Sequence, residues 1–123
     1  MENTDLTGRV IGAAIRVHSV LGPGMLESAY EACMKHVLTR EGLRVESQVP
    51  VPIKFEDIVI DVGYRLDLLV EQQIVVELKA VSKIIPIHEA QLLSHIKLGN
   101  YPVGLLLNFN VPKMREGIMR FAN

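Results

Sequence analysis

The chain has 123 residues, of which 49% are hydrophobic and 22% charged, so the composition excludes a disordered chain. This length predicts a single domain over residues 1–123. The 13 basic and 14 acidic residues give a formal net charge of −1, and the chain therefore lacks the basic excess of proteins that coat nucleic acid. Any nucleic-acid contact would need a local basic patch, metal ions or a partner protein.

The cellular location is indicated by what the sequence lacks. Cys33 is the only cysteine, which excludes an internal disulfide framework and a cysteine-based zinc site and fits a reducing compartment. The first ten residues are polar and acidic and do not look like a secretion signal. The longest apolar runs, such as Val103–Leu107, are too short to span a bilayer. We expect a cytoplasmic protein with no membrane partner.

Two helices are predicted first. Apolar residues recur at helical spacing from Leu6 to Val20, until residues 21–24 (LGPG) break the pattern. A second helix is predicted from Leu26 to Glu41, and Gly42 supplies its stop.

Strand patterns follow Gly42. Residues 44–53 alternate polar and apolar side chains, and Pro50 and Pro52 suit an edge strand because proline cannot donate to a central ladder. Further strands are predicted over 58–63, 65–70 and 74–81. Ile74–Val76 is apolar without alternation, as in a strand covered on both faces.

The last third returns to mixed structure. Pro86 precedes a predicted helix over 87–98, a nearly continuous apolar strand covers 103–109, and residues 111–123 hold a helical turn and a short strand. The predicted fold class is α/β in the mixed α+β sense, a mixed sheet with helices packed on it.

The strand around Glu77 and Lys79 carries the most specific chemical signal. These two charged residues lie two positions apart in an apolar strand, so both side chains share one face. Burying either charge costs several kcal/mol unless it is paired or bound to a metal.

The preceding strand offers that partner. A hairpin centred on Gln72 would place Asp67 opposite Glu77 and Arg65 opposite Lys79, with Cβ atoms of opposed residues about 4.5–5.5 Å apart. Two carboxylates this close repel each other unless a proton or a cation lies between them. The pair therefore suits a hard divalent cation such as Mg²⁺, although a one-residue shift of the turn would undo it.

A magnesium ion held there would polarise a phosphate and lower the pKa of a bound water. Lys79 would position the attacking water or offset the charge that develops on the phosphorane. The alternative is an ordinary salt bridge on the sheet face, joining Glu77 or Asp67 to Lys79 or Arg65.

Asp67 together with Glu77-Leu78-Lys79 resembles the signature of the PD-(D/E)XK nuclease superfamily. Within that superfamily, the chain resembles the GxxExxY family of small bacterial and archaeal proteins, whose naming motif is matched by Gly24, Glu27 and Tyr30. The similar segments cover nearly the full length and are residues 17–18, 21–30, 48–52, 61–67, 76–80, 88–93 and 107–110.

The resemblance implies a restriction-endonuclease-like core in the order α-β-β-β-α-β. It also implies that Glu27, Asp67 and Glu77 hold a metal, that Lys79 is the catalytic lysine and that Gln91 lies on the substrate-facing helix. Related members place a tyrosine four residues after that glutamine, whereas this chain has His95. Leu66 stands where many members have proline, which the superfamily tolerates.

Further substrate-binding candidates are Tyr30, Arg65, His88 and His95. Tyr30 shares a helix face with Glu27, and His88, Gln91 and His95 form a polar stripe on an otherwise apolar helix. A half-buried core tyrosine and a solvated helix face are the alternatives that the residues leave open.

The resulting hypothesis is Mg²⁺-dependent hydrolysis of phosphodiester bonds in DNA, with RNA as the other substrate and Mn²⁺ as the other metal. A homodimer or a larger complex is expected, because so small a domain has little surface with which to grip nucleic acid. The alternative is a non-catalytic nucleic-acid-binding or assembly module that keeps the nuclease fold.

Overall fold

The computed structural model describes residues 3–123 and confirms the predicted mixed α/β class. Its elements in chain order are α1 (Asn3–Leu21), α2 (Glu27–Arg40), β1 (Val45–Pro50), β2 (Ile53–Phe55), β3 (Ile58–Ile60), β4 (Arg65–Val70), β5 (Ile74–Lys79), α3 (Pro86–Leu98), β6 (Val103–Asn108), the 3₁₀ turn η1 (Met114–Gly117) and β7 (Ile118–Ala122).

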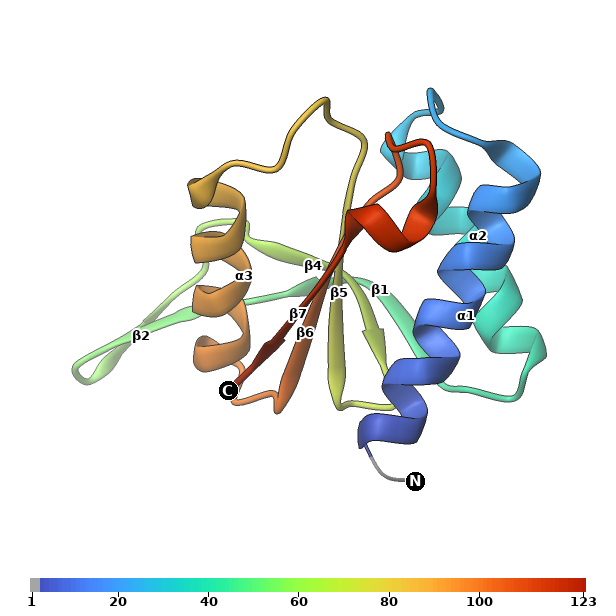
Figure 1. The fold of residues 1–123 in the computed structure, drawn as a ribbon. Helices are drawn as coiled ribbons and strands as arrows, with labels where there is room; N and C mark the ends of the chain where they lie inside the picture. The colour runs from blue at the N-terminus through green and yellow to red at the C-terminus, as the bar shows by residue number, and fades with distance from the viewer. Residues whose placement is uncertain (1–2) are drawn as a thin grey trace.

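A five-stranded sheet forms the middle layer, in the order β1-β4-β5-β6-β7. Among the neighbouring strand pairs described in this sheet, β5 and β6 alone run parallel, because α3 carries the chain from the end of β5 back to the start of β6. Helices α1 and α2 lie on one side of the sheet and α3 on the other (Figure 1). None of the helices in residues 3–123 combines the length and apolar character that crossing a membrane requires.

Each face of the sheet has its own core. Leu68, Val76 and Leu105 pack with the apolar faces of α1 and α2, whereas Leu69 and Val75 pack with α3. The first five residues of β5 are buried, as predicted for a strand covered on both faces. Because β5 is held on both faces, the side chains of Glu77 and Lys79 have fixed positions on the face of the sheet that α3 covers.

The predicted strand over 44–53 is not continuous, which corrects the sequence interpretation. It divides into β1, at the edge of the main sheet as expected, and β2, which pairs only with β3 in a separate two-stranded sheet. Pro50 and Pro52 cannot donate to a ladder, and the N–H of Val51 instead bonds to the carbonyl of Tyr64 at 2.9 Å. The β2–β3 hairpin therefore extends away from the body beside α3 (Figure 1).

Candidate active site

The site forms where β4 and β5 separate. Their ladder pairs Val70 with Ile74, Leu69 with Val75 and Leu68 with Val76, which is the register predicted for the hairpin. The ladder ends at Leu68 and Val76, so the predicted backbone pairs of Asp67 with Glu77 and of Arg65 with Lys79 are not part of it. Beyond the last pair the Asp67 side chain continues the contact, since its Oδ2 accepts the backbone N–H of Leu78 at 2.8 Å. Asp67 is thus fixed beside Glu77 by a hydrogen bond to the neighbouring strand.

A distortion on the other side of β4 contributes to this arrangement. The β1–β4 register includes Ser47 with Leu68 and Val49 with Leu66, but no pair joins Gln48 to Asp67. Gln48 has φ of +54°, a left-handed conformation that costs a non-glycine residue about 1–2 kcal/mol. Strain of this kind clusters at functional sites, where the surrounding structure holds it in place.

At this distortion the side chains of β4 switch from one face of the sheet to the other. Leu68 belongs to the core under α1 and α2, whereas Leu66, two residues earlier, belongs to the core under α3. In a regular strand both side chains would point the same way. Asp67 lies at the point of β4 where the side chains change sides, and it interacts both with β5 and with Glu31 of α2.

Glu77 is buried, with 8% of its surface exposed, and its Oε1 lies 3.2 Å from Nδ1 of His95 on α3. Burial raises the pKa of the Glu77 carboxyl above its ordinary value, and the bond from His95 opposes that rise. The negative charge of Asp67 raises this pKa further, while the charge of Lys79 lowers it. Asp67, Glu77, Lys79 and His95 are therefore one electrostatic cluster.

The predicted salt-bridge alternative is not the arrangement found. Glu77 pairs with His95, and Arg65 pairs with Asp61 at 3.6 Å. Lys79 acts on Glu77 through its charge, and no ion pair within 4 Å joins the two side chains in the described part of the chain.

A third carboxylate, that of Glu31 on α2, interacts with the site through the charge of Asp67. Burial raises the pKa of Glu31, a hydrogen bond from Gln48 Nε2 at 2.8 Å lowers it, and the charge of Asp67 raises it. Glu27, predicted as the acidic residue of this helix, is exposed, and its charge acts on Glu31. The sequence signal for Glu31 was its position one helical turn beyond Glu27.

Beside this cluster lies a pocket of about 530 Å³, between α3 and the base of the β2–β3 hairpin. Three of the predicted substrate-binding residues, Arg65, Gln91 and His95, line it. Tyr64 also lines it, with its ring 5.8 Å from that of His95, and sequence reasoning did not single Tyr64 out. His95 connects the two features, because it lines the pocket and bonds to Glu77.

The structure places Tyr30 elsewhere. Its side chain is 0% exposed and stacks on Phe109 at 4.3 Å between ring centroids. Its hydroxyl donates to the carbonyl of Gly22 at 2.5 Å and accepts the N–H of Met25 at 3.1 Å. Tyr30 is therefore a core residue that ties down the loop between α1 and α2, with no exposed surface to offer a substrate.

His88 also has a structural contact. Its Nδ1 accepts the N–H of Ile85 at 3.2 Å, so its ring caps the start of α3. His88 is absent from the residues that line the pocket. The predicted stripe on α3 thus divides into one capping residue and two pocket residues, Gln91 and His95.

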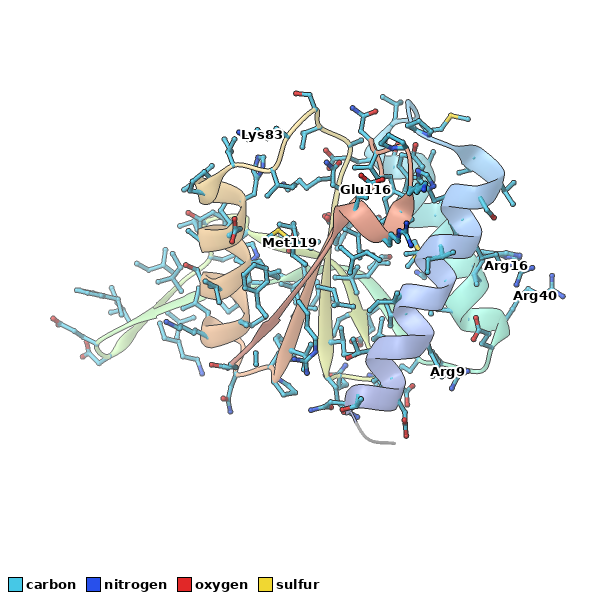
Figure 2. The ribbon with its side chains drawn as sticks, viewed as in Figure 1. Arg9, Arg16, Arg40, Lys83, Glu116 and Met119 are labelled. Carbon is cyan, nitrogen blue, oxygen red and sulfur yellow. The ribbon has the colours of Figure 1, made fainter. Side chains whose placement is uncertain are left out.

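Several basic side chains do not belong to the lining of this pocket. Arg9, Arg16 and Arg40 project from α1 and α2, on the side of the sheet opposite α3 (Figure 2). Lys83 lies on the loop that leads from β5 to α3 (Figure 2). The described structure therefore does not surround the pocket with these cations.

Two carboxylates at the site could hold a metal ion, namely those of Asp67 and Glu77. Within residues 3–123, no group of three or more His, Cys, Asp or Glu side chains is arranged to bind one. Mg²⁺ commonly takes only one or two protein carboxylates and keeps water or substrate oxygens as its other ligands. The donor set therefore fits a cation that is shared with a substrate.

The comparisons with known proteins give the family of the chain. The model of a family described as the PD-(D/E)XK nuclease superfamily matches residues 4–121, nearly the whole chain. No curated protein and no solved structure matched. The family indicates a nuclease-like function. Nucleases of this superfamily usually use divalent metal ions. The chain belongs to the PD-(D/E)XK nuclease superfamily.

Proposed function

We propose that this protein is a Mg²⁺-dependent nuclease that hydrolyses phosphodiester bonds in DNA, with RNA as the other substrate. The observation that carries the proposal is the cluster of Asp67, Glu77 and Lys79 where β4 and β5 separate. Without a cation, the cluster sets a buried carboxylate beside a second carboxylate, which is unfavourable for both.

Asp67 and Glu77 would hold the metal. A divalent cation between them would polarise the scissile phosphate and lower the pKa of a water molecule. The bond from Leu78 to Asp67 and the contact of His95 with Glu77 orient the two carboxylates, much as partners of metal ligands do elsewhere. Manganese fits the same oxygen donors.

Lys79 would orient the attacking water and offset the negative charge that develops on the phosphate. Gln91 and Arg65, on the pocket wall, would contact the substrate next to the reacting phosphate. The charge of Asp67 raises the pKa of Glu31 on α2, so these two carboxylates interact. We propose that Glu31, rather than Glu27, is the acidic residue of this helix that helps to hold the metal.

Two finer assignments are part of the proposal. Gly24, Glu27 and Tyr30 match the naming motif of the GxxExxY family, and we propose that the chain falls within it. We also propose that the protein works as a homodimer or in a larger complex. The β2–β3 hairpin supports this, since Phe55 and Val59 are 60% and 66% exposed.

A non-catalytic nucleic-acid-binding or assembly module is the second candidate. It is favoured by the net charge of −1 and by the lack of a three-ligand cluster among the described residues. The two candidates differ in whether Glu77 and Lys79 are needed for bond cleavage or only for the fold.

The deciding experiment compares the wild type with a Glu77→Ala/Lys79→Ala variant on labelled single-stranded DNA, duplex DNA, branched DNA and RNA. Each substrate is incubated with Mg²⁺, with Mn²⁺ and with EDTA, and Mg²⁺ binding is measured by calorimetry. We expect cleavage by the wild type alone, and only with metal. Nucleic-acid binding without cleavage, unchanged in EDTA and in Glu77→Gln, would instead support the binding module.

A further inference from the structure

The pocket beside the carboxylate cluster has one wall from a single face of α3. Ile87, Gln91, Ser94 and Leu98 follow one another at helical spacing along this wall. The opposite wall is the base of the β2–β3 hairpin, including Ile53 and Tyr64. The pocket ends at His95, behind which lies Glu77.

The lining is suited to a flat, partly polar group. Tyr64 is 48% exposed, and its ring is inclined by 47° to that of His95 across 5.8 Å, so part of its surface is open for stacking. Ile87 and Leu98 supply apolar surface, and Gln91 and Ser94 supply hydrogen-bond donors and acceptors. A volume of about 530 Å³ is in the range of sites that bury small organic groups.

The charges argue against a phosphate in this pocket. Arg65 is the cationic side chain among the described residues that line it, and Asp61 lies 3.6 Å from its guanidinium. Arg9, Arg16 and Arg40 project from the other side of the sheet (Figure 2). With Arg65 as the Lys/Arg side chain of its described lining, the pocket offers surface for stacking more than for phosphate neutralisation, and stacking contributes about 1–3 kcal/mol per base.

We propose that this pocket binds one unpaired nucleobase next to the scissile phosphate, and that the substrate is single-stranded nucleic acid or an unpaired end. The proposal rests on the nuclease function for the position of the phosphate. The base enters between Tyr64 and α3, and the adjoining phosphate reaches Asp67, Glu77 and Lys79 past His95. A continuous duplex keeps its bases paired and stacked and cannot fill the pocket without extruding one.

Binding is tested without cleavage, in EDTA, by fluorescence anisotropy. Labelled probes of equal length are a single-stranded oligodeoxynucleotide, its duplex and a strand of the same charge made of abasic sites. We expect the single strand to bind at least tenfold more tightly than either of the other probes. Equal binding of all three probes would overturn the proposal, because the backbone alone would then account for the affinity.

Three variants localise the effect. Tyr64→Ala should weaken single-strand binding about tenfold, which corresponds to about 1.4 kcal/mol, and Tyr64→Phe should restore it. Ser94→Leu places a bulkier side chain in the pocket and should weaken binding similarly, whereas Ser19→Leu, at an exposed position of α1, is the matched control. Circular dichroism and thermal unfolding check that each variant is folded, and unchanged binding by folded Tyr64→Ala and Ser94→Leu would reject the pocket.

The outcomes separate the two proposals. If the wild type cleaves and Tyr64→Ala has the same affinity for single strands and the same KM, the nuclease proposal stands and the base pocket is rejected. Base-dependent binding without cleavage in any metal would reject the nuclease and keep the pocket.

Discussion

At the scale of single residues, the site is organised by what burial does to a carboxylate. Glu77 is enclosed by β5 and α3, and the loss of water, together with the charge of Asp67, raises its pKa more than His95 and Lys79 lower it. A position of this kind is costly for a charged group and is retained where a ligand offsets the cost. The same reasoning applies more weakly to Glu31, which is more exposed.

The raised pKa of Glu77 predicts how metal-free stability depends on pH. The folded state holds this proton more tightly than the unfolded state, so deprotonation favours unfolding as pH rises from the unfolded pKa through the folded pKa. Glu77→Gln removes that loss, and in EDTA at neutral pH we expect the variant to unfold at a higher temperature than the wild type. Thermal unfolding between about pH 4 and pH 8 measures the difference.

The control for that comparison is Glu116→Gln, which removes one exposed carboxylate from η1. A difference between wild type and Glu77→Gln that stays the same at every pH would contradict the expectation.

The Tyr30 hydroxyl makes a second prediction at this scale. Tyr30→Phe keeps the stacking on Phe109 but leaves Gly22 and Met25 without their partner. We expect a loss of about 1–2 kcal/mol in the free energy of unfolding, measured by urea denaturation. Tyr101→Phe is the matched control, because the Tyr101 hydroxyl has no hydrogen bond to any of residues 3–123. An equal effect of the two changes would argue against the structural role.

At the scale of elements, the position of His95 depends on how closely α3 packs on the sheet. Gly104 of β6 lies beneath α3, and a Cβ there would come within 2.9 Å of Leu92 Cδ1 and 3.0 Å of Ile96 Cγ2. Both neighbours are fully buried and have little room to move. The absent side chain at Gly104 thus lets α3 bring His95 to Glu77.

Gly104→Ala is therefore expected to destabilise the fold by about 1–3 kcal/mol, since overpacking displaces the helix. Gly8→Ala, at an exposed position of α1, is the control, because nothing lies within 4 Å of its added methyl group. That change should instead stabilise by about 0.5–1 kcal/mol. Denaturant unfolding of both variants makes the comparison, and a stabilised Gly104→Ala would show that α3 is not in tight contact.

At the scale of the whole molecule, the near-neutral charge limits how nucleic acid can be held. The formal net charge is −1, and Arg9, Arg16 and Arg40 point away from the pocket side. Arg65, on the pocket wall, and Lys79, beside Glu77, are placed to meet a bound strand. Affinity should then depend on stacking more than on phosphate neutralisation.

This predicts a weak dependence of binding on salt. With two phosphates neutralised, the slope of log K against log salt for a single strand should be no steeper than about −1.4, at roughly −0.7 per contact. Anisotropy titrations across a range of salt concentrations in EDTA measure the slope. A slope several times steeper would show that further basic residues of the chain, or those of several copies, contact the strand.

The local pattern of the sequence determined most of the elements and the central pair of carboxylates. Hydrophobic periodicity and turn residues act over a few neighbours, so β4 was predicted with its observed bounds and α3 nearly so. The short hairpin after Val70 set the register of β4 and β5 in the same way. Asp67, Glu77 and Lys79 were therefore predictable as neighbours.

Only the tertiary structure decided which residues from other elements join them. Glu31 reaches Asp67 because of the distortion at Gln48, His95 reaches Glu77 because α3 packs closely over Gly104, and Tyr64 borders the pocket because the hairpin leaves the sheet. Tyr30 was drawn into the core by Phe109, 79 positions later in the chain. Such contacts depend on the packing of distant segments, on which the spacing of residues along the chain carries no direct information.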